Sequence, residues 1–276
     1  MMQLGIFAKT FAVQGARDVL LAARNAGYTC VQFNMASVGL PSMPDDIAPD
    51  VLAEISSAVT ETGVSIAAIS ATYNMIHPDA AIRKAGMRRL GTIIAAAAAL
   101  GVPMVTLCTG TRDAADQWRH HPDNGTPGAW RDLLKEMQQA AQLAEDHGVD
   151  LGIEPELANV VSSAKTARRM MDELQSPRLK IVLDPANLFE TGESRTIIAE
   201  AIGLVGSRIA MAHAKDRDAT GAFVAAGQGV VDFGLFIGGL KAAGFRGPVI
   251  THGLSEAEAP AVAAFLSAIL KNGVSQ

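Results

Sequence analysis

One unit recurs along the whole chain and constrains its fold more than any other feature. Each copy has a short apolar run, a polar loop, an amphipathic helical pattern and, in most copies, a glycine where the helix would end. The apolar runs predict eight strands, at residues 3–8, 29–35, 65–72, 104–110, 150–156, 179–185, 209–216 and 248–253. The helical patterns predict eight helices, at residues 16–25, 49–62, 80–100, 128–147, 163–174, 196–205, 233–243 and 257–271.

This alternation predicts a parallel sheet covered by helices on its outer side, because parallel strands need crossover connections. Eight such units close into a barrel, so we predict a single (β/α)8 TIM barrel domain over residues 1–276. The 49% of apolar residues agrees with fully buried strands. A doubly wound open sheet is the competing fold, but it needs a glycine-rich phosphate loop after its first strand. Here that position has the sequence FAKTFAVQG.

Charge and cysteine content limit the partners and the compartment that we expect. The net charge of −5 disfavours binding to nucleic acid or to an anionic membrane, because both need clustered Lys and Arg. Cys30 and Cys108 lie in separate apolar runs, and the N-terminus does not resemble a signal peptide. We therefore predict a cytoplasmic protein. The uncharged stretch 90–111 is broken by GVP, which predicts a buried helix, a turn and a strand rather than a membrane span.

Four consecutive predicted strands end in a side chain that can bind a metal ion. These residues are Glu154, Asp184, His213 and His252. Adjacent strands lie roughly 5 Å apart, so the four side chains should converge at the carboxyl end of the barrel. A mixed set of carboxylates and imidazoles suits Mn, Co, Zn, Fe or Ni better than Mg or Ca. Taken singly, each residue is equally explained as a helix cap or a partner of a lysine.

Further polar residues are predicted to surround this point. Glu156 follows Glu154 by two positions and is a candidate general base, or else a surface carboxylate. Lys215 follows His213 by two positions and is a candidate for neutralising an anionic substrate or intermediate. The candidate substrate contacts are Thr72, Asn74 and His77 after the third strand, and Trp118, His120 and His121 in the long loop 111–127; loop scaffolding is the alternative for each.

The glycine-rich stretch GQGVVDFG, at residues 227–234, is predicted to have a structural role. Gly227 and Gly229 would supply a turn, and Asp232 would cap the following helix. We therefore expect no direct part for it in catalysis.

Three short motifs give the chain a resemblance to a known family. The motifs IEPE, VLDPAN and AHAKD follow one another in the order that xylose isomerase-like barrels use for their metal ligands. This family includes sugar-phosphate isomerases and epimerases, ketose 3-epimerases and inosose dehydratase. The resemblance implies that Glu154, Asp184 and His213 bind a divalent metal ion. It also implies that Asn187, which stands where many relatives have a histidine, contacts the substrate.

One departure from the family bears on the reaction. Members usually have a glutamate at the end of strand eight, and His252 stands there in this chain. In the epimerases two metal-bound glutamates act as a pair of proton-transfer groups, so the loss of one weakens the case for that mechanism.

The predicted function is a metal-dependent isomerase or epimerase of a sugar or sugar phosphate. Glu154 or Glu156 would take the proton next to a carbonyl, and the metal or Lys215 would stabilise the enediolate. The alternatives are a polyol or inosose-type dehydratase that uses the same site, and a barrel that binds carbohydrate without converting it. A small carbohydrate is thus the expected partner, and the relatives suggest a homo-oligomer.

Overall fold

A closed barrel of eight parallel strands forms the centre of the molecule. The computed structural model describes residues 2–188 and 194–272. The strands are β1 (Leu4–Phe7), β2 (Cys30–Phe33), β3 (Ser65–Ser70), β4 (Met104–Cys108), β5 (Asp150–Glu154), β6 (Leu179–Leu183), β7 (Ile209–Ala214) and β10 (Val249–Thr251). They pair in chain order, and β10 closes the ring against β1. The predicted TIM barrel is confirmed.

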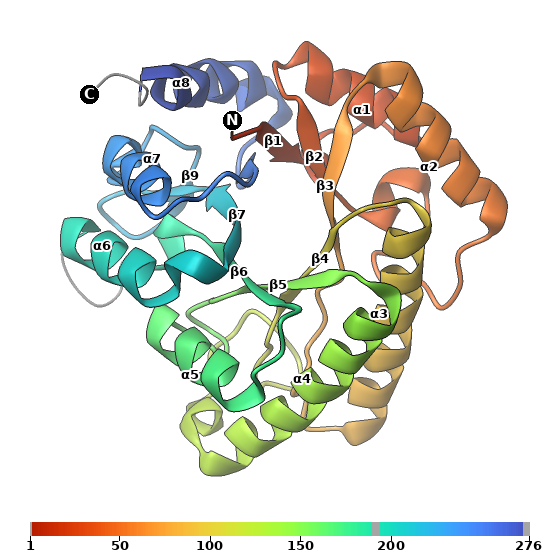
Figure 1. Ribbon diagram of the computed structural model, residues 1–276, viewed down its shortest axis with the longest axis vertical. Coiled ribbons are helices and arrows are strands. Elements are labelled where there is room, and N and C mark those ends of the chain that lie inside the picture. The colour runs from red at the N-terminus through yellow and green to blue at the C-terminus, as the bar shows by residue number, and fades with distance from the viewer. Residues whose placement is uncertain (1, 189–193, 273–276) are drawn as a thin grey trace.

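Within the described residues, eight α-helices surround the strands, and Figure 1 shows their arrangement from one end of the molecule. They are α1 (Ala16–Asn25), α2 (Pro49–Thr62), α3 (Ala80–Ala99), α4 (Pro127–His147), α5 (Ala164–Leu174), α6 (Ser194–Val205), α7 (Phe233–Ala242) and α8 (Ala259–Asn272). Their ends follow local capping chemistry. Thr126 caps α4 by accepting a hydrogen bond from the Ala129 N–H, and Asp232 caps α7 by accepting one from the Leu235 N–H, as predicted.

The stretch 90–111 forms the end of α3, a turn and β4, as predicted. Within the described residues, no helix has both the length and the hydropathy that a membrane span requires.

The structure contains one hairpin that the sequence did not predict. Strand β7 ends at Ala214 rather than at Asp216, and the chain then forms β8 (Asp216–Arg217) and β9 (Phe223–Val224), which pair antiparallel. Strands of two residues carry too little periodicity to be recognised in a sequence. This hairpin belongs to the connection between β7 and α7.

The interior of the barrel is built in layers. Six strands each contribute one buried side chain to an apolar layer, formed by Cys30, Ala68, Met104, Val182, Met211 and Ile250. Gly152 takes the corresponding position on β5, where a Cβ atom would lie only 2.7 Å from the Met104 sulfur. Side chains alternate along a strand, so the residue two positions further on also points inward. On β5, β6, β7 and β10 those residues are Glu154, Asp184, His213 and His252, which therefore lie directly above an apolar floor.

Candidate active site

The four strand-end residues come together as a cluster. Each of Glu154, Asp184, His213 and His252 offers one ligand atom, and these atoms all lie within 4.8 Å of one another. The residues follow or end β5, β6, β7 and β10, which are neighbours in the barrel. The convergence arises because the carboxyl ends of parallel strands meet at one end of a barrel.

The histidine of β7 is held in an orientation that suits metal binding. Its Nε2 lies 2.8 Å from Gln32 Oε1, while Gln32 Nε2 donates to Thr106 Oγ1. Because the Gln32 carbonyl oxygen can only accept, Nε2 of His213 carries a proton, and Nδ1 is the ring nitrogen that faces the cluster. This Nδ1 is buried without a hydrogen-bond partner, although Glu154 Oε1 lies 3.2 Å away. Burial lowers the pKa of His213, but the charge of Glu154 outweighs burial and raises it. A cation is therefore favoured between Nδ1 and the carboxylate, and a divalent metal ion can take the place of the proton there, so the residues fit a divalent metal ion.

The charges of the cluster are balanced within it. Burial raises the pKa of the Asp184 carboxyl. Lys215, whose Nζ lies 3.4 Å from Asp184 Oδ2, and His252 together outweigh burial and hold this pKa well below its usual range. Burial likewise opposes ionisation of Glu154, and the attraction of His213 still lowers its pKa. Burial and the neighbouring His213 lower the pKa of His252, which favours the neutral imidazole that metals bind.

Asn187 connects the cluster to two further polar groups. Its Nδ2 donates to Glu154 Oε1 at 3.0 Å and to Glu156 Oε2 at 2.9 Å, and its Oδ1 accepts from Lys215 Nζ at 3.1 Å. The Asn187 residue is only 1% exposed and does not line the cavity at the mouth. Burial and the charge of Glu154 raise the pKa of Glu156 to about 7. Contact between Asn187 and a substrate stays a prediction, since its polar atoms already bridge three side chains of the site.

A cavity of about 510 Å³ opens above the cluster at the carboxyl ends of the strands. This volume lies in the range of small-molecule sites. The predicted residues that line it are Glu154, Glu156, His213, Lys215, His252, Thr72 and Trp118. Asp184 lies behind them with a side chain that is inaccessible to solvent. The structure therefore brings Glu154, Glu156, His213, His252 and Lys215 to the lining of one cavity.

Four other predicted contacts lie outside this cavity lining, and one of them, His120, is an exposed loop residue. Asn74 Oδ1 accepts from the Thr111 N–H, and its Nδ2 donates to the Asp113 carbonyl. His77 lies 3.1 Å from the Ala114 carbonyl oxygen. His121 accepts from the Asp123 N–H. The other three side chains bond to loop backbone, which favours the scaffolding alternative, and contact of all four residues with a substrate stays a prediction.

Sequence reasoning missed Gln32 and Phe223. Gln32 stands two residues after Cys30, at an inward position of β2, so its period-two spacing was the available signal. Phe223 lies on the unpredicted hairpin, lines the cavity, and has its ring centroid 3.8 Å from Lys215 Nζ. This aromatic ring is 48% exposed, which is unusual for a large apolar side chain and places it at the entrance.

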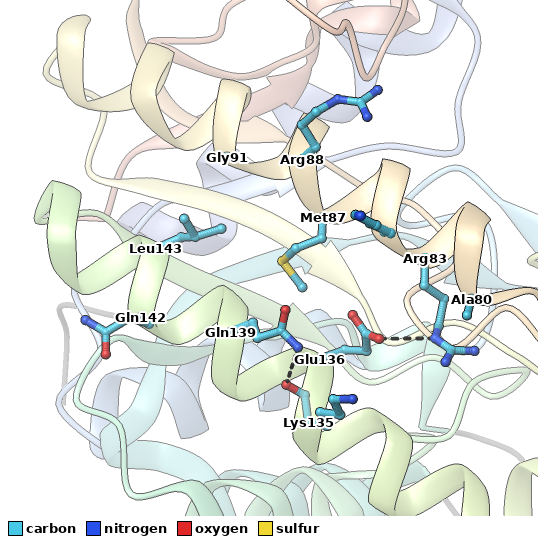
Figure 2. Close-up of a pocket in the computed structure, with 11 residues that line it drawn as sticks. Ala80, Arg83, Met87, Arg88, Gly91, Lys135, Glu136, Gln139, Gln142 and Leu143 are labelled. Atoms are coloured by element: carbon cyan, nitrogen blue, oxygen red, sulfur yellow. Dashed lines mark hydrogen bonds and ion pairs between the residues drawn. The ribbon is translucent and has the colours of Figure 1, made fainter.

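A second hollow, of about 640 Å³, lies on the outside of the barrel between α3 and α4. Figure 2 shows Met87 and Leu143 in this groove, with the ion pair of Arg83 and Glu136 at one end. Although the groove is larger than the cavity at the barrel mouth, its lining has no histidine or cysteine, and its one carboxylate is bound to Arg83. The cavity at the barrel mouth is therefore the better candidate for the active site.

Comparisons with known proteins find relatives that are named as sugar epimerases. The curated L-ribulose-5-phosphate 3-epimerase UlaE of Escherichia coli is 26% identical over 266 residues, which cover 94% of this chain and 89% of that protein. A solved L-ribulose 3-epimerase has a TM-score of 0.77 at 19% identity and covers 99% of this chain and 96% of its own. The 3-keto-D-glucoside 4-epimerase YcjR from E. coli has a TM-score of 0.77 at 17% identity, with 98% and 100% covered.

These homologues are named as sugar epimerases, in agreement with the predicted class of isomerase or epimerase. The family model described as xylose isomerase-like TIM barrel matches residues 20–269. The chain therefore belongs to the xylose isomerase-like TIM barrel family.

Proposed function

We propose that the protein is a sugar epimerase or isomerase that depends on a divalent metal ion. The observation that carries the proposal is the convergence of Glu154, Asp184, His213 and His252, with the buried Nδ1 of His213 directed at Glu154. The epimerase names of the relatives support a carbohydrate substrate.

The four clustered residues would hold the metal, which when bound supplies Lewis-acid polarisation of a carbonyl or hydroxyl oxygen. Glu156 is the carboxylate outside this cluster that lines the cavity, so we assign it the removal of the proton next to the carbonyl. The Asn187 amide holds its carboxylate in place. The ammonium of Lys215 lies in the same cavity and can stabilise negative charge that develops on the substrate oxygen.

The return of the proton distinguishes the two reaction types. An isomerisation needs one carboxylate, which returns the proton to the neighbouring carbon. An epimerisation needs a second proton-transfer group on the opposite face of the sugar. His252 follows β10, three strands along the barrel from β5 and Glu156. A metal-bound imidazole has no basic nitrogen free to take a proton, so His252 can be this second group only if it is not a metal ligand. In both reactions the proton is removed and returned, and no further reactant is consumed.

Solvent exchange tests the proposal before the natural substrate is known. The purified protein, loaded in turn with Mn, Co or Zn, is incubated with a panel of ketoses and aldoses in deuterated water, and exchange at the carbon next to the carbonyl is followed by NMR. We expect exchange that requires the metal and is lost in Glu156→Gln. A dehydratase would instead give a product lighter by one water, which mass spectrometry detects.

Matched variants test the site assignment. Glu154→Gln and His213→Ala should lose both bound metal and exchange, whereas Glu145→Gln and His147→Ala, which change exposed residues of α4, should lose neither. If Glu154→Gln and His213→Ala leave metal content and exchange unchanged, the proposed site is wrong.

A further inference from the structure

We propose that the substrate is an unphosphorylated sugar rather than a sugar phosphate. This inference rests on the proposed function and narrows its substrate class. It comes from two loops at the barrel mouth whose backbone N–H groups are already bound to carboxylates of the chain itself.

TIM-barrel enzymes frequently bind phosphate with the loops that follow the seventh and eighth strands. Such sites are made of backbone N–H groups that converge on the anion. In this chain the loop after β7 does contain converging N–H groups. Those of Gly227 and Gly229 donate to Asp216 Oδ2 at 3.0 and 2.9 Å, and that of Val231 donates to Asp216 Oδ1 at 3.0 Å. The Asp216 residue is fully buried, so an internal carboxylate occupies the place of an anionic ligand.

The glycines of this loop are required by the internal carboxylate. Gly227 has a φ of +91°, a conformation that other residues rarely adopt. A Cβ atom on Gly229 would overlap both the Asp216 carboxylate and the Arg217 carbonyl oxygen. The predicted structural role of these glycines is thus supported, and its physical purpose is to bring the backbone against Asp216.

The loop after β10 also carries a bound carboxylate, in a helix capping box. The N–H and the hydroxyl of Ser255 both donate to Glu258 Oε2, at 2.8 and 2.7 Å. Gln228 Nε2 donates to Glu258 Oε1 at 3.2 Å, which joins this loop to the loop after β7. Both loops therefore carry a carboxylate, whose negative charge would repel a phosphate dianion.

The cations that line the cavity compensate little for the repulsion of a phosphate group by these carboxylates. Of the cavity-lining residues that the structure describes, only Lys9 and Lys215 are cations. Lys215 is 6% exposed and is engaged by Asp184, Asn187 and the Phe223 ring. Lys9 is exposed, and a single exposed lysine contributes little to binding. Phosphate recognition usually combines several charge-assisted donors.

The remaining lining residues suit a neutral polyol. Three are aromatic and six carry a hydroxyl or amide group: Phe7, Trp118, Phe223, Gln32, Asn34, Ser42, Ser70, Thr72 and Gln117. Aromatic faces pack against the C–H surface of a sugar, and the polar groups can exchange hydrogen bonds with its hydroxyls. The relatives include enzymes named for a free sugar and for a sugar phosphate, so they do not decide between the two.

Binding of a matched pair of sugars tests the inference independently of turnover. The affinities of the manganese-loaded protein for L-ribulose and for L-ribulose 5-phosphate are measured by calorimetry. We expect the free sugar to bind at least about tenfold more tightly. Equal or tighter binding of the phosphate ester, or binding of neither sugar, overturns the inference. Solvent exchange is followed in parallel, and preferred binding of the free sugar without exchange would instead count against the proposed function.

Asp216 provides a second test. Asp216→Gly removes the carboxylate and leaves three N–H groups free for an external anion. We expect millimolar inorganic phosphate to raise the Tm of this variant and to leave the Tm of the unmodified protein unchanged, because a ligand stabilises the folded state that binds it. Stabilisation of the unmodified protein by phosphate would overturn the inference. If the variant does not fold, the binding comparison decides.

Discussion

The Nε2 atom of His252 lies 3.1 Å from Oδ2 of Asp184, which joins the end of β10 to the end of β6. This imidazole completes the cluster at the position where members of the family usually have a glutamate. The cluster consequently carries two carboxylates rather than three, and a divalent ion would bring it close to neutrality. A metal that is less shielded by anionic ligands polarises a substrate oxygen more strongly.

We predict that His252→Ala lowers the affinity for a divalent ion by about 100-fold, because it removes one of four converging ligand atoms. His252→Glu should retain the metal. Metal content after dialysis against a weak chelator measures both effects, and His147→Ala is the control for the loss of a histidine. Full metal content in His252→Ala would mean that the protein supplies only three ligands.

We predict that Glu156→Gln lowers kcat by about 10²- to 10⁴-fold while metal content is unchanged. The reason is that Glu156 lines the cavity without belonging to the metal cluster. Asn187→Ala should have a smaller effect in the same direction, because the Glu156 carboxylate would lose the amide that holds it. Steady-state kinetics and metal analysis check both, and loss of metal in Glu156→Gln would make this residue part of the metal site instead.

The sequence predicted those parts of the site that depend on position along a strand. Glu154, Asp184, His213 and His252 each end or follow an apolar run, and the period of two directs them inward. The roles of Asn187 and Gln32 depend on hydrogen bonds to residues distant in the chain, such as that between Gln32 and His213. Such long-range hydrogen bonds follow from how the strands are placed relative to one another, and a local sequence pattern does not contain that information. For the same reason, no local pattern shows that the side chains of Asn74 and His77 bond to loop backbone, and the sequence predicts both as substrate contacts at the barrel mouth.

We predict that an ion pair in the long loop 111–127 stabilises the folded protein at neutral pH and that this stabilisation is lost at acid pH. The Arg119 guanidinium, with the N–H groups of Ala115 and Asp116, holds the pKa of Asp113 well below its usual range. A carboxyl whose pKa is lower in the folded state stabilises the protein at a pH above its unfolded pKa, about 3.9, and loses this effect as the pH falls through the folded value. The Tm of Asp113→Asn should therefore be lower than that of the unmodified protein at neutral pH, and the difference should shrink in acid. A constant difference from neutral pH to pH of about 2 would contradict this origin.

The final prediction concerns two glycines of α3 that differ in the space around them. A Cβ atom on Gly86 would overlap the ring of Tyr73, whereas one on Gly91 would lie 3.8 Å from Leu143 Cδ1, in the groove of Figure 2. Replacing glycine by alanine within a helix is favourable by itself, because alanine restricts the unfolded chain. Gly91→Ala should therefore raise the free energy of unfolding by about 0.4–1 kcal/mol.

Gly86→Ala should instead lower the free energy of unfolding by about 1–3 kcal/mol, since the Tyr73 ring is buried and has to move to admit the methyl group. Urea denaturation of both variants measures the two effects. Adding Tyr73→Ala makes room for the methyl group, so Gly86→Ala should cost much less in that background than in the unmodified protein. If Gly86→Ala is equally destabilising in both backgrounds, the contact with Tyr73 is not the cause.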